Sequence, residues 1–382
     1  MKHLIKILFN TLLAALLLTA CEKADDLPFY ENGTAPAVTA SASTIAPVPA
    51  DSLAAGLTLS WTNPSYASDS ATYKYVVEID RAGNSFANAA QRVITGSLST
   101  TYLNKELNNI LIDKGLEFGT AYDMEVRVIS SYSNNNDRLI SNVLPIKMTP
   151  YKVPPRVELP TSGKLFLVGG ATDGGWNNPV PAPTQEFSRL DETTFAGVFR
   201  LKGNEEYLVL PVNGSWDSKY SVANKNLAGL SAGGDFGFGL NDNFPGPAAE
   251  GMYKIVLDFQ AGKFTVTPYT ENTLPMNLFK VGDATPGGWN NPVPAPDQQF
   301  TRLNSVEFEL TINLFGGKQY LLLPVNGSWD NKYSVQDNTL TGLADGGTFG
   351  FNLPQNFPGP ATDGTYKINV NFATSKFSVV KQ

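Results

Sequence analysis

Histidine and cysteine are almost missing from this sequence of 382 residues, since each occurs once, as His3 and Cys21. Ser-His-Asp and Cys-His catalysis both need an imidazole to move the proton of the nucleophile. Zinc sites are built mainly from histidine and cysteine, and a disulfide within the chain needs a second cysteine. Because we expect His3 to be removed with a signal peptide, these classes of chemistry are excluded. We expect no metal site and no cofactor.

Positive charge is also scarce. The sequence has 28 Lys and Arg against 35 Asp and Glu, which gives a net charge of −7. Nucleic-acid binding needs clustered positive charge to neutralise phosphates, and so does docking on an anionic membrane surface. We therefore expect no nucleic-acid partner. The 34 Gly and 26 Pro indicate many turns, and the length suggests roughly two or three domains.

The one long apolar run lies at the N-terminus. Residues 1–20 have a short basic start and an apolar core from Ile7 to Leu18, and they end directly before Cys21. This pattern is typical of a signal peptide, and Leu-Thr-Ala-Cys resembles the bacterial lipobox, in which the cysteine is lipidated. The alternative is an ordinary signal peptide with an incidental cysteine. Residues 21–35 are predicted to be a tether, whose acidic start resembles the surface-export signal of Bacteroidetes lipoproteins.

Residues 36–152 are predicted to form one β-sandwich domain, similar to immunoglobulin or fibronectin-type modules. Leu103–Leu111 is expected to be a short helix, and Trp61 to be the tryptophan of the core. Three segments rich in aromatic and β-branched residues are typical of strands: Leu57–Trp61, Tyr73–Ile79 and Ala121–Val128.

Residues 161–270 and 274–382, here called module 1 and module 2, are two copies of one sequence. Trp176 and Trp289 are 113 residues apart (289 − 176), and the same offset relates Trp216 to Trp329. The copies align without a gap, and each has the length of a domain. Short strands and frequent turns predict that each copy is a compact antiparallel β-sandwich, so the whole fold is all-β. The strands expected in module 1 are Lys164–Val168, Thr194–Leu201, Glu206–Pro211, Gly251–Phe259 and Lys263–Thr267.

Four of the five tryptophans lie in turn sequences that both modules share, either Gly-Gly-Trp-Asn-Asn-Pro or Asn-Gly-Ser-Trp-Asp. Turns lie on the surface, and an exposed indole with amide and carboxylate neighbours suits a sugar. The alternative is a tryptophan folded back over the core, and the two tyrosines among the candidates fit a core position equally well. The candidate glycan-binding residues are Trp176, Asn177, Asn213, Trp216, Lys219 and Tyr220 in module 1, and Trp289, Asn290, Asn326, Trp329, Lys332 and Tyr333 in module 2.

Paired acids, which a glycosidase needs, are poorly repeated between the modules. Asp217 corresponds to Asp330 and Glu250 to Asp363, whereas Asp173 is replaced by proline in module 2. We therefore expect no enzyme. A glycan-active enzyme with one active copy stays open as an alternative, as does a structural lipoprotein that uses its tryptophans to bind a protein partner.

Taken together, the lipobox, the immunoglobulin-like domain and two modules with Gly-Gly-Trp, Gly-Ser-Trp-Asp and Phe-Pro-Gly-Pro resemble the SusE/SusF starch-binding lipoproteins of Bacteroidetes. This resemblance implies a non-catalytic lipoprotein in the outer membrane, anchored by lipid and exposed at the cell surface. It also implies that the chain binds α-glucan, as starch and maltooligosaccharides, for uptake beside a SusC/SusD-like outer-membrane complex.

The resemblance further implies that Trp176 and Trp216 form an arc around the glycan, as do the equivalent residues of module 2. Members of this family often have a Lys or Arg in the strand before the second aromatic residue. Here that strand is Tyr207–Leu210 in module 1, so Lys219 and Lys332 are the expected substitutes. Because a short linker joins the modules, we expect their sites to bind one polymer with avidity.

Overall fold

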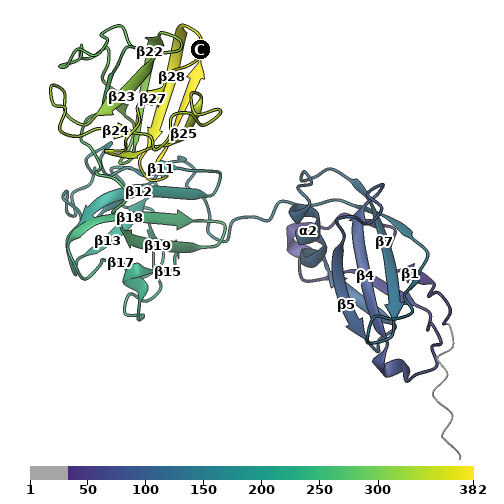
Figure 1. The fold of residues 1–382 in the computed structure, drawn as a ribbon. Helices are drawn as coiled ribbons and strands as arrows, with labels where there is room; N and C mark the ends of the chain where they lie inside the picture. The colour runs from purple at the N-terminus through teal and green to yellow at the C-terminus, as the bar shows by residue number, and fades with distance from the viewer. Residues whose placement is uncertain (1–32) are drawn as a thin grey trace, which may run out of the picture. The chain divides into compact units, whose positions relative to one another are not determined.

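The computed structural model describes residues 33–382, which divide into two compact units, 33–154 and Pro155–Gln382. Strands dominate both units (Figure 1), and the all-β prediction is confirmed. The predicted signal peptide, Cys21 and most of the predicted tether lie outside the described residues. Among residues 33–382, no helix is long and apolar enough to cross a membrane.

The N-terminal unit is a sandwich of two sheets. One sheet has the order β1 (Val38–Ala40), β3 (Ala55–Trp61), β6 (Ser99–Leu103). The other has the order β2 (Thr44–Ile45), β9 (Leu144–Met148), β7 (Tyr122–Ser131), β4 (Lys74–Arg81), β5 (Ala90–Thr95), and β8 (Leu139–Ile140) pairs with β7. Its helices are α2 (Asn104–Asp113) and the 3-10 turns Pro49–Asp51 and Ser70–Thr72.

Alternating residues build the core of this unit. In β3, Leu57, Leu59 and Trp61 are buried while the residues between them are at least partly exposed, because neighbouring side chains on a strand point to opposite faces. The indole of Trp61 packs 5.3 Å from the ring of Tyr75 on β4, in the facing sheet. The predicted strands, the helix near Leu103 and the core tryptophan are all present.

In module 1, each of two sheets contains five strands. The first has the order β10 (Phe166–Val168), β13 (Glu206–Leu210), β14 (Tyr220–Ser221), β16 (Gly237–Phe238), with β17 (Phe244–Pro245) paired to β13. The second has the order β11 (Ser188–Arg189), β12 (Thr194–Leu201), β18 (Gly251–Asp258), β19 (Lys263–Pro268), β15 (Gly233–Asp235). A 3-10 turn spans Leu230–Ala232.

Module 2 repeats this topology strand for strand. Its first sheet is β20 (Phe279–Val281), β23 (Gln319–Leu323), β24 (Tyr333–Ser334), β26 (Gly350–Phe351), with β27 (Phe357–Pro358) on β23. Its second sheet is β21 (Thr301–Arg302), β22 (Glu307–Leu314), β28 (Gly364–Asn371), β29 (Lys376–Lys381), β25 (Gly346–Thr348). The exact module limits predicted at 161–270 and 274–382 stay a prediction.

The two modules pack end to end within one unit. Ala196 and Val198 on β12 of module 1 belong to the same buried cluster as Val306 and Phe372 of module 2. Polar contacts extend this packing, because the Ser188 hydroxyl donates to the Glu307 carboxylate over 3.1 Å, and the Ser305 N–H donates to the Glu186 carbonyl over 2.8 Å.

The linker between the modules is packed as well. The Tyr269 hydroxyl donates to the carbonyl of Phe372 (3.0 Å), and the Asn272 amide donates to the hydroxyl of Ser375 (2.9 Å). Leu274 packs against the core cluster of module 2. The linker is therefore part of the unit, and the spacing of the two modules is set by packing as well as by linker length.

Candidate glycan-binding surfaces

The first tryptophan of each module ends a tight loop that follows the first strand. In module 1 the Gly169 N–H donates to the Gly175 carbonyl over 3.0 Å, and the Thr172 hydroxyl donates to the Gly169 carbonyl over 3.0 Å. Gly175 has a φ of 58°, a conformation that glycine adopts readily. The loop therefore turns sharply just before Trp176. Module 2 closes the same loop between Gly282 and Gly288.

The second tryptophan lies in the turn after β13. The Ser215 hydroxyl donates to the Asp217 carboxylate over 2.9 Å, and the Asp217 N–H donates to the Ser215 hydroxyl over 3.1 Å. Gly214 takes a φ of 94°, which favours glycine at this position. Trp216 is thus held between two residues whose side chains fix the turn.

A pair of asparagines joins the two loops of each module. The Asn178 side chain accepts the Gly214 N–H over 2.7 Å and donates to the Ser215 carbonyl over 3.1 Å. The Asn213 side chain accepts the Val180 N–H over 2.7 Å. Because Asn178 follows Trp176 by two residues and Ser215 precedes Trp216, these bonds bring both tryptophans to one edge of the module. Asn291 and Asn326 form the same bonds in module 2.

All four loop tryptophans are exposed to solvent. Their exposed fractions are 44% for Trp176, 50% for Trp216, 40% for Trp289 and 51% for Trp329. Monomeric proteins usually bury much of a tryptophan ring, so four half-exposed rings at equivalent places mark a surface that is open to a ligand. None of them is folded back over the core.

Tyr220 and Tyr333 correct one of the sequence-based expectations. They are 1% and 0% exposed, because the two-residue strands β14 and β24 turn these rings into the sandwich. Tyr220 lies 5.0 Å from the ring of Phe259, and its hydroxyl donates to the Glu158 carbonyl over 2.9 Å. Burial raises the pKa of Tyr220. A ring enclosed in this way offers no face to a sugar, so both tyrosines are core residues.

The remaining predicted residues differ in how free their side chains are. Asn213 uses both ends of its amide to bond Val180, and Asn326 does the same with Val293, so these two asparagines hold the loops together. Asn177 and Asn290 are exposed and donate to the carbonyls of Gly174 and Gly287 over 2.9 Å, which leaves their amide oxygens as acceptors. Lys219 and Lys332 are half-buried, and neither forms an ion pair among residues 33–382.

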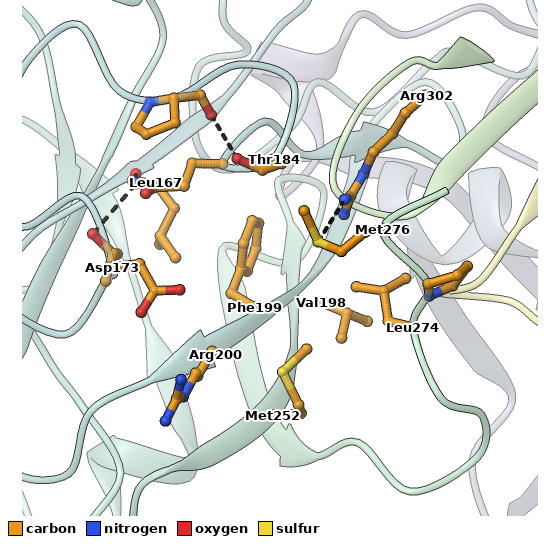
Figure 2. A pocket seen from close by; sticks show the side chains of 14 residues that line it. Leu167, Asp173, Thr184, Val198, Phe199, Arg200, Met252, Leu274, Met276 and Arg302 are labelled. Atoms are coloured by element: carbon orange, nitrogen blue, oxygen red, sulfur yellow. Dashed lines mark hydrogen bonds between the residues drawn. The ribbon is translucent and has the colours of Figure 1, made fainter. Parts of the chain in front are cut away.

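The junction of the modules holds a cavity of about 330 Å³ (Figure 2). Its walls are mainly apolar, with Phe199, Met252 and Leu274 among the lining residues, and Asp173 is its one acidic residue. Glycoside hydrolysis needs two carboxylates, so this cavity does not supply the pair. Within the described part of the chain, no group of three or more His, Cys, Asp or Glu side chains is placed to hold a metal ion.

Comparison with known proteins adds evidence about one part of the chain. Residues 23–129 match the model of a family described as SusE outer membrane protein. Among solved structures, a similar one is the crystal structure of SusF from Bacteroides thetaiotaomicron, with 16% sequence identity and a TM-score of 0.35. The alignment covers 91% of this chain and 76% of that chain. No curated protein sequence matches the chain.

The family match lies in the N-terminal region, from the predicted tether into β7, and so it is independent of the modules and their tryptophans. It agrees with the outer-membrane location expected from the sequence, and that location is confirmed. Lipidation of Cys21 stays a prediction. The predicted resemblance is confirmed over this region, because residues 23–129 match the SusE outer membrane protein family.

Proposed function

We propose that this protein binds α-glucan at the outer membrane without cleaving it. The observation that carries this proposal is the pair of exposed tryptophans on one edge of each module, fixed in place by Asn178 or its equivalent Asn291. A sugar ring stacks its apolar face on an indole, and its hydroxyls form hydrogen bonds with nearby polar groups. Asn177 and Lys219 supply such groups in module 1, as do Asn290 and Lys332 in module 2.

Starch and maltooligosaccharides are the proposed ligands, on the strength of the likeness to SusE. An α-1,4-glucan is curved, and the arc of two indoles that the family resemblance implies would match a curved chain better than a flat one. A surface that stacks sugars one at a time binds weakly, since each aromatic contact contributes on the order of 1 kcal/mol. We therefore expect dissociation constants for each site of roughly micromolar to millimolar.

The two modules are proposed to act on one polymer chain together. Ala196 and Val198 pack against module 2, so both sites belong to one unit and are carried at a fixed spacing. The second site then meets a high effective concentration of the same polymer once the first is occupied. Lipidation of Cys21 and contact with a SusC/SusD-like complex would place this unit beside the uptake machinery, and both belong to the proposal.

Calorimetric titration of the soluble chain, beginning at Glu22, tests the ligand class. We expect maltoheptaose and α-cyclodextrin to bind and cellohexaose, which is straight and flat, to bind much more weakly. A matched variant, Trp176→Ala with Trp289→Ala, should bind both α-glucans less well. Tight binding of cellohexaose without binding of α-cyclodextrin would contradict the α-glucan assignment, and wild-type binding by the variant would contradict the stacking assignment. Shorter products after incubation with maltoheptaose would show an enzyme instead.

A further inference from the structure

The surface beside the first tryptophan is built from the loop that carries it and from the turn between two strands. In module 1 the turn is residues 202–205, between β12 and β13. The Lys202 N–H donates to the Ala171 carbonyl over 2.8 Å, which ties this turn to the tryptophan loop. A Cβ placed on Gly170 would lie 2.6 Å from the Glu205 carboxylate and 3.4 Å from the indole nitrogen of Trp176. The edge of Trp176 and the side chain of Glu205 therefore meet over Gly170.

Module 2 keeps this frame. The Phe315 N–H donates to the Ala284 carbonyl over 2.9 Å, as Lys202 does to Ala171, and the Ala284 N–H donates to the Gln319 carbonyl over 3.1 Å, as Ala171 does to Glu206. Asp283 stands where module 1 has Gly170, and its carboxylate accepts the Gln319 N–H over 2.9 Å. The turn 315–318 therefore lies beside the loop that ends at Trp289, just as the turn 202–205 lies beside the loop of Trp176.

The side chains on this shared frame differ in kind. Phe315 stands where module 1 has Lys202, and Lys318 stands where it has Glu205. The Phe315 side chain is 45% exposed and Lys318 is exposed as well. Burial in the core does not explain a phenylalanine at an exposed turn. An aromatic ring and an ammonium group on a turn next to the loop of an exposed indole are the groups that a further sugar would use.

We propose that Phe315 and Lys318 form an additional sugar subsite in module 2, so that module 2 binds a longer segment of glycan than module 1. This inference rests on the proposed α-glucan binding and adds a difference between the two sites to it. The Phe315 ring stacks on the next sugar along from Trp289, and the Lys318 ammonium donates to its hydroxyls. Module 1 offers Lys202 and Glu205 at these places, which form hydrogen bonds but provide no stacking face.

The test compares the two sites within the whole soluble chain. Trp176→Ala with Trp216→Ala leaves module 2 as the binding module, and Trp289→Ala with Trp329→Ala leaves module 1. Dissociation constants are measured for maltooligosaccharides of increasing length. We expect affinity to keep rising with length for module 2 after it has levelled off for module 1. In the chain that binds through module 2, Phe315→Lys should weaken binding of long oligosaccharides by about three- to tenfold and change binding of the shortest ones little.

Two matched variants sharpen the result. Leu340→Lys, at another exposed apolar residue of module 2 that is 58% exposed, should leave binding unchanged. Lys202→Phe, in the chain that binds through module 1, should extend the length dependence of that site. Equal length dependence of the two modules, or a Phe315→Lys chain that binds like its parent while Trp289→Ala abolishes binding, would overturn the inference and leave the proposed function standing. A chain with both sites intact that binds no maltoheptaose would overturn the proposed function as well.

Discussion

Module 1 and module 2 share a topology and a set of loop hydrogen bonds, yet the side chains on one equivalent face differ sharply. In module 1 this face packs against module 2, and in module 2 it is free. Ala196 and Val198 of module 1 are buried by module 2, and their equivalents are Glu309 and Thr311. Thr311 is exposed, and Glu309 forms an ion pair with Lys367. The residues that hold the loops are thus the same in both modules. The residues on this face are apolar where a module packs against it and polar where the face is free.

A second difference lies inside the modules. Leu167 is buried in module 1, and the equivalent residue of module 2 is Lys280, which is also fully buried. Its ammonium nitrogen lies 2.8 Å from the centroid of the Tyr320 ring, and it has no hydrogen-bond partner among the described residues. Burial lowers the pKa of Lys280 well below its usual value. Burial of this amine therefore lowers the folding stability of module 2, and module 1 has no equivalent buried amine.

Exchanging these two residues should have the largest effect. Leu167→Lys should destabilise module 1 by about 2–4 kcal/mol, because it buries an amine without a partner. Lys280→Leu should stabilise module 2 by about 1–3 kcal/mol at neutral pH. Denaturant unfolding of the two variants beside the parent chain measures both changes.

The pH dependence of stability tests whether the buried amine of Lys280 is the reason for these changes. The unfolded chain keeps Lys280 protonated up to about pH 10.4, whereas the folded chain releases this proton at lower pH. Over the interval between the two pKa values the unfolded state binds more protons, so stability rises with pH. The gain from Lys280→Leu should therefore be greatest at low pH and fade as the pH approaches about 10.4. A gain that does not change with pH would mean that packing, and not the amine, is responsible.

Separating the modules should have the next largest effect. A Cβ on Gly197 would lie 2.9 Å from the Ser305 hydroxyl across the module junction, and 2.3 Å from the ring of Phe199. The equivalent residue of module 2 is Leu310. Gly197→Leu should therefore cost about 1–3 kcal/mol by overpacking, and calorimetry should then show the two modules unfolding in separate transitions. Thr311→Ala, at an exposed residue on the free face of module 2, is the control and should leave the junction intact.

The loop asparagines should give the smallest effect on stability. Asn178→Ala removes the bonds to Gly214 and Ser215 and should cost about 1 kcal/mol. Because these bonds position both tryptophans, maltoheptaose binding at module 1 should weaken, and binding at module 2 should not. Asn224→Ala is a matched control, since its side-chain oxygen accepts the Asn226 N–H over 3.0 Å in a loop that carries neither tryptophan. Equal losses in both variants would count against a positioning role for Asn178.

Much of the fold could be predicted from local sequence. Regular alternation of apolar and polar residues marked the strand β7, and the gapless repeat predicted that the two modules share a topology. The two-residue strands could not be seen, because a pattern needs several residues to show its period. For this reason the sequence allowed either a surface or a core position for Tyr220, which directly follows a turn motif. Its ring points inward because Tyr220 pairs with Val209 on β13.

The site was predicted in part. The turn motifs of Trp176 and Trp216 indicated exposed rings, and the structure has them exposed. The amides of Asn178 and Asn213 were open to either a turn or a ligand, since both roles use the same groups. The packing of Gly197 against Ser305 depends on residues of two modules, and neither module alone carries a signal for it.

The most direct test of the account is the number of maltoheptaose molecules that one chain binds, measured by titration calorimetry. We expect two sites in the parent chain, one site after Trp176→Ala with Trp216→Ala, and one site after Trp289→Ala with Trp329→Ala. All four substitutions together should abolish binding while the chain stays folded, as its thermal unfolding would show. A folded chain without the four indoles that still binds maltoheptaose at two sites would contradict the account.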